Sequence, residues 1–397
     1  MSEAVLTVNA GSSSLKFGVY ERGQPHAAIT GQIEGLEPGG TPVLKLAGQA
    51  PEGLEAGAGQ AGGHEGAFEM ALRRLAALLG ARARPVRLRA VAHRIVHGGE
   101  RYTSAVRVDA EVMQALQALE PLAPLHQPHN LAGVRAFARA YPDLPQIACF
   151  DTAFHATLPE VERRFALPAL PALAGVRRYG FHGLSYQYLT QVMGERSPRM
   201  AGGRALMAHL GNGASVCAVR EGHSVATSMG FSALDGLMMG TRSGSLDAGV
   251  LLHLLRQGWT ADQLEDLLYK RSGLKGVSGL SADMRTLRAS QDERAQQAIA
   301  LFTHRVLRES GAMVAVLGGL DVLVFTGGIG EHDGVLRQAV CQGLAHLGVV
   351  LDEAANARAT GDDILPIHAP DSAAEVWVVP TDEGRVAAGQ AWSLLEG

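Results

Sequence analysis

The stretch VLTVNAGSSSLKFGV, from Val5 to Val19, consists of two apolar runs joined by a turn of glycine and serine. A second stretch, ALMAHLGNGASVCAV from Ala205 to Val219, also consists of two apolar runs joined by a glycine-containing turn, in the other half of the chain. Such a turn directs several backbone N–H groups into one cavity, with hydroxyl or amide side chains beside them, which suits a polyphosphate. The pair therefore predicts a duplicated scaffold that binds one nucleotide.

Length and composition are typical of a two-domain enzyme. At 397 residues the chain is longer than a single hydrophobic core usually allows. Hydrophobic residues make up 47% and charged residues 19%, which excludes a disordered chain. The net charge of -4 creates no strong field for nucleic acid or an anionic membrane, so we expect neither as a partner, and the phosphate site must be locally basic.

The cysteines and the start of the chain point to a reducing compartment. Cys149, Cys217 and Cys341 lie far apart and lack the spacing of metal ligands, so we expect reduced thiols in the core. No basic segment followed by an apolar run opens the chain, and no run approaches the length of a membrane span. These features predict a cytoplasmic protein.

Strand and helix patterns alternate in the first half of the chain, as in α/β folds. Apolar runs bounded by turn residues predict strands at Val5–Val8, Leu15–Tyr20, Ala27–Ile33, Val43–Leu46, Leu88–Val96 and Gln146–Phe150. Helical periodicity predicts helices at Phe68–Leu79, Ala110–Leu119 and Asn130–Ala140. Gly48–Gly66 has no apolar periodicity and is expected to be a surface connection.

The second half follows a similar order. A strand-rich stretch begins near Arg204, and helices are predicted at Ala248–Gln257, Ala261–Lys270, Glu293–Leu317 and Gly334–His346. Leu320–Phe325 predicts a strand that ends in a glycine turn at Thr326–Glu331, where a flat ligand could approach the backbone. The tail predicts a strand at Val376–Val379 and a final helix. Two related halves are the expected architecture.

The first hairpin combines an amide, hydroxyls and a cation, and its candidate ligands are Asn9, Ser12, Ser14 and Lys16. The alternative is a serine-rich turn with a purely structural role. Lys16, just past the serines, favours phosphate binding. Because a strand and not a helix follows, this segment is not a P-loop.

Two arginines occupy similar settings beside glycine turns. Arg94 follows a mostly apolar strand in AHRIVHGGERY, and Arg242 follows a Gly-Thr turn in MMGTRSGSLD. A pair of guanidinium groups could hold a carboxylate or a transferring phosphoryl group by paired hydrogen bonds. The alternative for a strand-end arginine is a structural salt bridge.

Histidines gather in turn-like segments, and seven are notable: His93, His97, His126, His129, His155, His182 and His209. No HExxH spacing occurs, which argues against a catalytic zinc. Any one of them could be structural. His182 stands out because Gly180 and Gly183 bracket it in RRYGFHGLSY.

Two carboxylates follow apolar strands, Asp151 after QIACF and Glu383 after VWVV. Magnesium in phosphoryl-transfer sites usually binds one or two carboxylates together with water and phosphate oxygens. The alternatives are a helix N-cap for Asp151 and a first-turn acid for Glu383.

Together these segments resemble the acetate kinases and their propionate- and butyrate-kinase relatives. The motifs that carry the resemblance are VNAGSSSLKF, HRIVHGGERY, PLAPLHQPHN, FDTAFHATLP, RRYGFHGLSY, AHLGNGASV, TSMGFSALDGLMMGTRSGSLD and FTGGIGEHDGVLR. The resemblance implies an α/β fold of two actin-like, ribonuclease-H-like domains, of the type shared by sugar kinases, Hsp70 and actin, with a nucleotide cleft between the duplicated domains. We expect an N-terminal domain at 1–150, on which the C-terminal helix 383–397 packs, and a nucleotide-binding domain at 151–382.

The resemblance also implies an activity, the reversible reaction of ATP and a small carboxylate, acetate, to ADP and acetyl phosphate in a homodimer. Mg²⁺ is the implied metal, with Mn²⁺ as an alternative. A carboxylate is already ionised and needs no general base, so direct in-line transfer is the expected mechanism, and a covalent intermediate on Glu383 or Asp151 is the lesser one. A non-catalytic ATP switch remains the alternative from another class.

Residue roles follow from the same resemblance. Arg94 and Arg242 would flank the reacting groups, His182 and Arg242 would stabilise the transferred group, and Asn9, Asp151 and Glu383 would organise phosphates and metal, with Asn9 and Glu383 nearest the metal. The second phosphate hairpin would be His209, Leu210, Gly211, Asn212 and Gly213. The adenosine would contact Asp283, Met284, Arg285, Gly328, Ile329, Gly330 and Glu331. The pocket for the acyl methyl would comprise Val96, Leu125, Phe181 and Ala233 beside Arg94.

Three positions depart from the family pattern. Ala233 stands where proline is common, and its smaller side chain could enlarge the acyl pocket. One methylene is worth only about 1–3 kcal/mol of discrimination in an apolar pocket, so propionate or butyrate remains an alternative substrate. Met284 stands where phenylalanine is common, and Gly384 where a second glutamate usually follows Glu383.

Overall fold

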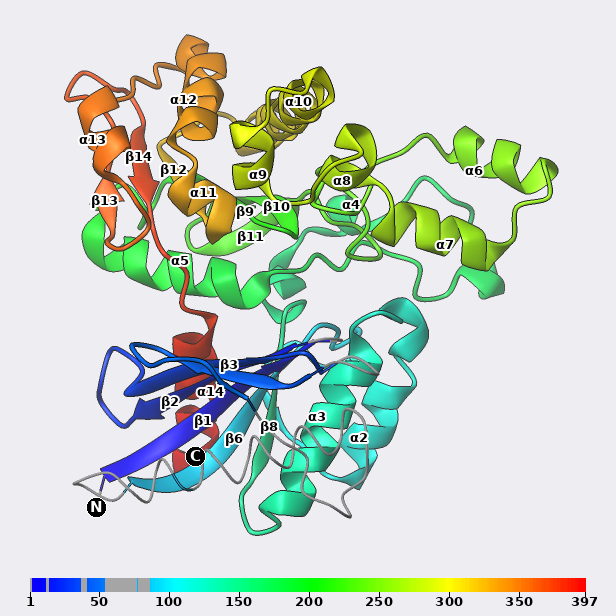
Figure 1. Ribbon diagram of the computed structural model, residues 1–397, viewed down its shortest axis with the longest axis vertical. Coiled ribbons are helices and arrows are strands. Elements are labelled where there is room, and N and C mark those ends of the chain that lie inside the picture. The colour runs from blue at the N-terminus through cyan, green and yellow to red at the C-terminus, as the bar shows by residue number, and fades with distance from the viewer. Residues whose placement is uncertain (1, 12–13, 37–40, 54–76, 78–85) are drawn as a thin grey trace. The chain divides into compact units, whose positions relative to one another are not determined.

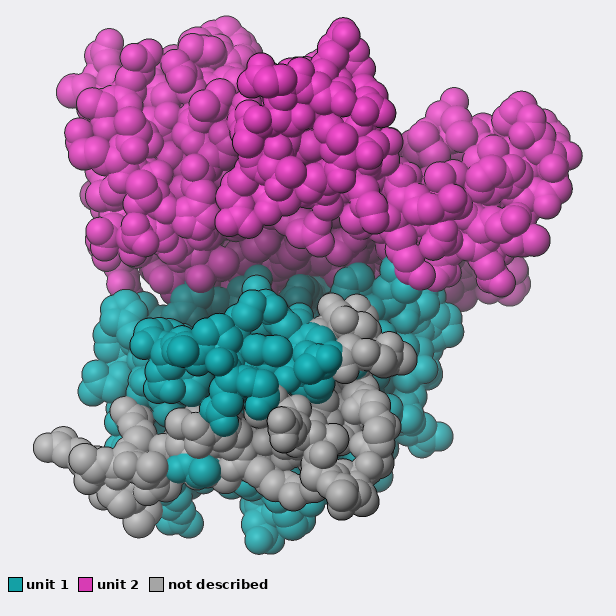
Figure 2. Space-filling view, viewed as in Figure 1, with its two compact units in different colours: residues 1–153, 382–397 teal, residues 154–381 magenta. Residues whose placement is uncertain are grey.

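The computed structural model describes residues 2–11, 14–36, 41–53, 77 and 86–397. The chain divides into two compact units, which Figure 2 distinguishes by colour. Unit 1 comprises residues 1–153 and 382–397, and unit 2 comprises residues 154–381. The C-terminal segment thus belongs to the same unit as the N-terminal strands.

Unit 1 is built on an eight-stranded sheet with the order β5-β4-β3-β2-β1-β6-β8-β7. Its strands are β1 (Ser2–Ala10), β2 (Ser14–Glu21), β3 (Ile29–Glu34), β4 (Val43–Leu46), β5 (Glu52–Gly53), β6 (Val86–Ile95), β7 (Val106–Arg107) and β8 (Gln146–Phe150). Residues 4–8 of β1 are all buried, because α3 and α14 both pack on this part of the sheet. This explains why the buried part of β1 is apolar except for Thr7 and does not alternate.

Unit 2 is built on a six-stranded sheet with the order β11-β10-β9-β12-β14-β13. Its strands are β9 (Arg204–Leu210), β10 (Ala214–Arg220), β11 (His223–Thr227), β12 (Val322–Thr326), β13 (Leu365–Pro366) and β14 (Glu375–Val378). The strands β11-β10-β9-β12-β14 repeat the order and directions of β3-β2-β1-β6-β8, an antiparallel meander followed by two parallel strands. The predicted duplication of an α/β scaffold is therefore confirmed.

The described helices are drawn in Figure 1, and several of them pack on the two sheets. In unit 1 they are α2 (Ala110–Gln117), η1 (Glu120–Leu122), α3 (Gln127–Ala140) and α14 (Glu383–Glu396). In unit 2 they are α4 (Glu160–Arg163), η3 (Pro171–Leu173), α5 (Gly183–Arg196), α6 (Ala248–Arg256), α7 (Ala261–Lys270), α8 (Gly273–Ser278), α9 (Met284–Ala289), α10 (Glu293–Leu317), α11 (Gly327–His332), α12 (Gly334–Gly343), η4 (Ala345–Leu347) and α13 (Glu353–Arg358). The short helix η2 (Ala153–Thr157) lies where unit 1 ends and unit 2 begins.

Most predicted elements are present, some with the same bounds, such as β8, α7 and α10. The predicted glycine turn at Thr326–Glu331 is wrong, since Gly327–His332 forms the short helix α11. Its glycines do not prevent this, because Gly327 needs its positive φ of 77° only to turn the chain from β12 into the helix. The helix predicted at Phe68–Leu79 and most of the connection at Gly48–Gly66 lie outside the described residues.

Two further differences concern the helices: one begins earlier than predicted, and one was not predicted. The helix predicted from Asn130 begins at Gln127, because Pro128 in its first turn needs no hydrogen-bond acceptor. Helix α5 was not predicted, since it is buried along most of its length and shows little amphipathic pattern. Over the described part of the chain, no helix has the length and apolar character needed to span a bilayer.

Candidate active site

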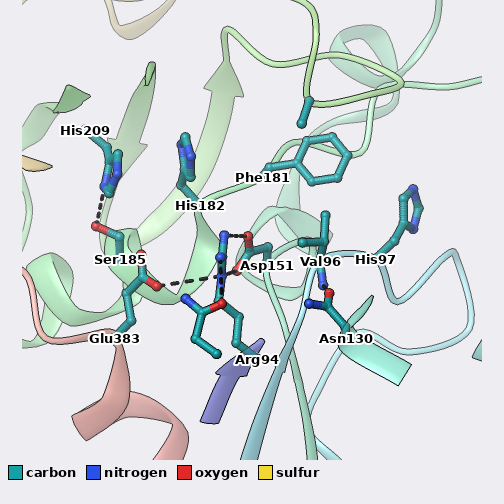
Figure 3. A network of polar contacts seen from close by, with 12 residues as sticks. Arg94, Val96, His97, Asn130, Asp151, Phe181, His182, Ser185, His209 and Glu383 are labelled. Atoms are coloured by element: carbon teal, nitrogen blue, oxygen red, sulfur yellow. Dashed lines mark hydrogen bonds and ion pairs between the residues drawn. The ribbon is translucent and has the colours of Figure 1, made fainter. Parts of the chain in front are cut away.

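In unit 1 the central group is an ion pair between Arg94 on β6 and Asp151 just after β8 (Figure 3). These neighbouring parallel strands place Arg94 opposite Cys149, two residues before Asp151. The guanidinium donates through Nε to Oδ1 at 2.9 Å and through Nη2 to Oδ2 at 2.5 Å, a bidentate geometry. Asp151 is only 1% exposed. It therefore orients Arg94.

Two other groups meet the same guanidinium. Arg94 Nη1 donates to Asn9 Oδ1 at 3.3 Å, and Glu383 Oε2 lies 3.6 Å from Arg94 Nε. Burial would lower the pKa of Arg94, but the charges of Asp151 and Glu383 and the hydrogen bonds to Asp151 outweigh burial and raise this pKa. Arg94 is thus a permanent cation. The two carboxylates beside it, Asp151 and Glu383, together carry one more negative charge than Arg94 balances. The amide and carboxylate oxygens beside it are the donor types that Mg²⁺ prefers.

Glu383 lies in the first turn of helix α14, which is the position that its alternative, structural role predicted. The N-cap Asp382 accepts from Arg385 N at 2.9 Å and from the Tyr20 hydroxyl at 2.5 Å. A Cβ at Gly384 would lie 2.3 Å from the Tyr20 oxygen, so the Tyr20 side chain fills the space that a side chain at 384 would need. The departure at Gly384 therefore accommodates a tyrosine that anchors the helix carrying Glu383.

Three predicted ligands of the first hairpin, Asn9, Ser14 and Lys16, lie on its two described strands. Ala10 pairs with Leu15, and Gly11 N donates to Ser14 O at 2.8 Å across the turn. Asn9 and Lys16 are directly paired across the strands, so their side chains share one face, and Lys16 is exposed. Ser12 lies outside the described residues.

Two buried amides that the sequence did not single out hold this region together. Asn130 on α3 donates to Ala10 O at 2.6 Å and accepts from Val96 N at 3.0 Å, and thereby ties the end of β1 to the residue after β6. Gln127 accepts from His97 N and donates to His97 O. Both lie in the quoted PLAPLHQPHN segment, so that motif contained the signal. Val96 is buried and Leu125 is half-buried.

In unit 2 the second hairpin meets a histidine and an arginine. Leu210 pairs with Ala214, and Gly211 N donates to Gly213 O at 3.0 Å. A Cβ at Gly213 would lie 3.1 Å from His182 Nε2 and 3.7 Å from Arg242 Nη2. The hairpin backbone, the imidazole and the guanidinium therefore converge at this glycine. An anion held by this turn would have the imidazole of His182 and the guanidinium of Arg242 beside it.

His182 has an unusual backbone, with φ 59° and ψ 24°, at the start of α5. Its ring stacks on His209, with centroids 4.2 Å apart and an angle of 21° between the planes (Figure 3). His209 Nδ1 and Ser185 Oγ are 2.9 Å apart. A strained left-handed residue in a glycine-flanked turn is a frequent feature of functional sites.

Two other histidines of the cluster, His93 and His155, have structural roles in the core. His93 is hydrogen-bonded to Gln146, and His155 lies between Ser224 and Phe181 O. Burial lowers the pKa of each to about 4, so both are neutral core residues.

Arg242 lies on the connection between β11 and α6. It donates through Nη1 to Ala233 O at 2.9 Å and contacts Met239 Sδ. Met239 N in turn donates to Arg242 O at 3.1 Å, and Gly240 N donates to Asn212 O at 3.0 Å. These bonds connect the arginine's loop directly to the second hairpin. The predicted acyl residues Phe181, which is buried, and Ala233, which is half-buried, belong to this unit as well.

A cavity of about 930 Å³ opens beside the hairpin within unit 2. It is lined by Gly211, Asn212, Ala282, Asp283, Met284, Arg285, Arg288, Ala289, Gly328, Ile329, His332, Asp333, Gly334 and Val335. Most of the predicted adenosine ligands are therefore brought together. Arg288 and Asp333, which the sequence did not single out, form a bidentate pair with distances of 3.0 and 3.2 Å.

Two predicted nucleotide ligands, Gly330 and Glu331, are not part of this lining. Glu331 Oε1 accepts from Gly327 N at 2.8 Å, from Thr326 Oγ1 at 3.1 Å and from Thr381 N at 3.0 Å. The carboxylate thus accepts from the first N–H of α11 and also binds the backbone of Thr381, which precedes α14 in the sequence. It shapes the loop that lines the cavity.

Comparisons with known proteins show which proteins this chain resembles. The chain is 48% identical over its full length to the acetate kinase of Rhodopseudomonas palustris, all of which it covers. Its structure matches that of Porphyromonas gingivalis acetate kinase with a TM-score of 0.87 and 36% identity, covering 99% of this chain and 100% of that one. It matches a propionate kinase from Francisella tularensis with a TM-score of 0.88 and 34% identity, covering 98% of each. Residues 4–389 match the sequence profile of the Acetokinase family, and the chain belongs to that family.

Proposed function

We propose that this chain transfers the γ-phosphoryl group of ATP to acetate, reversibly and in one in-line step, to form acetyl phosphate and ADP. The observation that carries the proposal is the role of the second hairpin. Gly211 and Asn212 line a nucleotide-sized cavity, while Gly213 lies against His182 Nε2 and Arg242 Nη2. A nucleotide in the cavity would extend its phosphates along the hairpin toward these two side chains.

The residues supply positioning and charge, which is what phosphoryl transfer to a carboxylate requires. Acetate is ionised at neutral pH, so no general base is needed. Arg242 would neutralise charge on the transferring group, His182 would donate a hydrogen bond to it, and Arg94 would hold the carboxylate. Asp151 is a poor candidate for a nucleophile, because its two oxygens are engaged by Arg94 and it is buried.

Asn9 and Glu383 would hold Mg²⁺, with Mn²⁺ as a substitute. Within the described residues there is no cluster of three or more acidic, histidine or cysteine side chains that could cage a metal alone. This fits an ion that takes most of its ligands from phosphate oxygens and water. When bound, such a metal neutralises phosphate charge.

The test is an acyl-phosphate assay with hydroxylamine trapping. Purified protein is incubated with ATP and Mg²⁺, with acetate, propionate, butyrate or no carboxylate. We expect hydroxamate only when a carboxylate is present, and most with acetate. ATP hydrolysis that does not depend on any carboxylate would contradict the proposal and favour an ATP switch.

A second candidate, a kinase of propionate, is favoured by Ala233. The bond from Arg242 uses the backbone oxygen of this residue, so a proline here would still accept this bond, while it adds ring volume, fixes φ and removes the backbone N–H. We expect Ala233→Pro to lower kcat/KM for propionate relative to acetate by about 10-fold, the scale of one methylene in an apolar pocket. An unchanged ratio of the two kcat/KM values would exclude Ala233 as the specificity position.

We also propose a homodimer that buries α6. This helix extends from the sheet of unit 2 (Figure 1) and has no buried residue. Its exposed apolar side chains include Val250, Leu252 and Leu255, which are 39%, 52% and 47% exposed, and Leu246 precedes it. Apolar groups clustered in this way are typical of protein interfaces.

The dimer is tested by replacing Leu252 and Leu255 with glutamate. We expect the double variant to be monomeric in light scattering coupled to gel filtration, because two charges would be buried without partners. The control Leu394→Glu changes an exposed leucine of α14, which is 44% exposed, and should leave the mass unchanged. A double variant with the mass of the unaltered protein would place the interface elsewhere.

The cysteines support a cytoplasmic location for this enzyme. Cys149, Cys217 and Cys341 are all free and buried. Burial raises the pKa of each thiol to about 12, so they remain protonated and unreactive. Free core thiols are typical of reducing compartments.

A further inference from the structure

Behind His182 lie two hydroxyl groups in a row, and neither stood out in the sequence. Ser215 Oγ on β10 is 2.8 Å from His182 Nδ1, and the Tyr186 hydroxyl on α5 is 2.5 Å from the same serine oxygen. Tyr186 and Ser215 are both 0% exposed. Tyr186 N also donates to His182 O at 3.1 Å, so the first turn of α5 ties the tyrosine to the histidine.

The direction of the hydrogen bonds follows from the tyrosine. Burial raises the pKa of Tyr186 well above its ordinary value, so the phenol keeps its proton. The hydrogen bonds of the phenol to Ser215 and to the backbone of His209 lower this pKa but do not outweigh burial, and Ser215 Oγ is the side-chain partner of the phenol. The proton of Tyr186 is therefore directed to Ser215 Oγ. The serine, which has one proton, then donates it to His182 Nδ1.

An imidazole whose Nδ1 accepts a hydrogen bond carries its proton on Nε2. We propose that Tyr186 and Ser215 are positioning residues that hold His182 as the neutral Nε2–H tautomer, with this N–H directed at the transferring phosphoryl group. The inference rests on the proposed function for the role of His182, but the tautomer can be measured without it.

Two further observations support this assignment. The Nε2 edge of His182 is the one that faces the second hairpin, since a Cβ at Gly213 would lie 3.1 Å from Nε2 and 3.5 Å from Cε1. The stacked ring of His209 lies 4.2 Å away, and two imidazolium charges at that separation would repel each other. His209 has its own hydroxyl partner, Ser185, which also contacts Thr381 Oγ1 at 3.1 Å.

The arrangement matters for catalysis because only a protonated Nε2 can donate to a phosphoryl oxygen. The opposite tautomer would present a lone pair to an anion, which is repulsive. Loss of a group that orients a functional imidazole typically costs about 10-fold to 100-fold. We therefore expect Tyr186→Phe, which removes only the phenol oxygen, to lower kcat by about 10-fold, with little change in the KM of ATP.

The direct test is nitrogen-15 NMR of the full chain labelled at histidine, without substrates. The His182 signals are assigned by their loss in His182→Gln. In the unaltered protein at neutral pH we expect one proton-bearing nitrogen, Nε2, and an unprotonated Nδ1. In Tyr186→Phe and Ser215→Ala we expect the two tautomers to mix, and Ser215→Thr, which keeps a hydroxyl, should restore the Nε2–H form and the turnover.

The matched control is Tyr188→Phe, the same change on the same helix outside this chain of hydroxyls, which should alter neither the spectrum nor kcat. A proton on Nδ1 of His182 in the unaltered protein, or an unchanged tautomer in Tyr186→Phe, would overturn the inference. Failure of the proposed function looks different, because the chain would then form no acyl phosphate while the Nε2–H signal remained.

Discussion

Replacing Arg242 by alanine is expected to lower kcat for acetyl phosphate formation by about 10²–10³, the usual cost of losing one donor that stabilises a transition state. Its guanidinium lies beside the hairpin turn, with Nη2 3.7 Å from where a Cβ at Gly213 would lie. Among the described residues of unit 2, the ring beside it at Gly213 is that of His182, which is expected to be neutral and so would not replace the lost positive charge. The KM of ATP should change much less, because the cavity is lined by other residues.

Two variants make this result specific. Arg242→Lys keeps the charge but loses the planar fork, so it should recover only part of the activity. Arg294→Ala makes the same truncation at an exposed pair with Asp292 and should leave kcat unchanged. The turn at Arg242 is held by the bond from Met239 N to Arg242 O, which alanine retains. Near-normal turnover in a folded Arg242→Ala protein would remove this residue from the mechanism.

The largest expected effect on stability belongs to Arg337, a fully buried arginine of α12. Its guanidinium donates to the backbone oxygens of Gly330, Glu331, Asn356 and Ala359 and to Asn356 Oδ1, at 2.7 to 2.9 Å. It thereby satisfies the last carbonyls of α11 and α13 together. Burial lowers the pKa of Arg337, and these acceptors offset part of the cost of burying the charge.

Arg337→Met should destabilise unit 2 by about 4 kcal/mol or more, because each buried acceptor left without a donor costs about 1–3 kcal/mol. This corresponds to a fall in Tm of about 10 °C. The KM of ATP should also rise, since α11 lines the cavity through Gly328 and Ile329. Thermal unfolding followed by circular dichroism is the measurement.

The control for this variant is Arg358→Met on α13, an exposed arginine one residue before Ala359. It should change the unfolding free energy by less than about 0.5 kcal/mol. Equal thermal stability of Arg337→Met and Arg358→Met would show that water replaces the lost donors and that Arg337 does not hold α11.

The fold could be predicted from local patterns because it depends on two short, repeated signals. Each glycine hairpin sits between apolar runs, and both became the antiparallel pair at the centre of a sheet with the same strand order. The error at Thr326–Glu331 has a local cause. Three glycines in six residues favour a turn, yet Glu331 accepts from Gly327 N at the start of the helix, and Arg337 donates to the carbonyls of Gly330 and Glu331 near its end.

Residues of the candidate site could be predicted where a charged or polar side chain lies within a recognisable sequence motif. Arg94, Asp151, His182, Arg242 and the hairpin residues each lie in a recognisable stretch, and those in one unit are found close together. The supporting groups were not predictable in this way. Ser215 and Tyr186 are ordinary residues of a buried strand and a buried helix, and only their contact with His182 gives them a role.

Residue types, glycine positions and periodicity along the chain were enough to predict a duplicated α/β scaffold, two glycine hairpins and a set of cationic and acidic candidates. These features depend on interactions between near neighbours in sequence. Which proton His182 carries, why position 384 must lack a side chain beside Tyr20, and how Arg337 secures α11 depend on groups far apart in sequence. Such contacts arise only when the units fold, because directional hydrogen bonds and close packing require distances that sequence spacing does not specify.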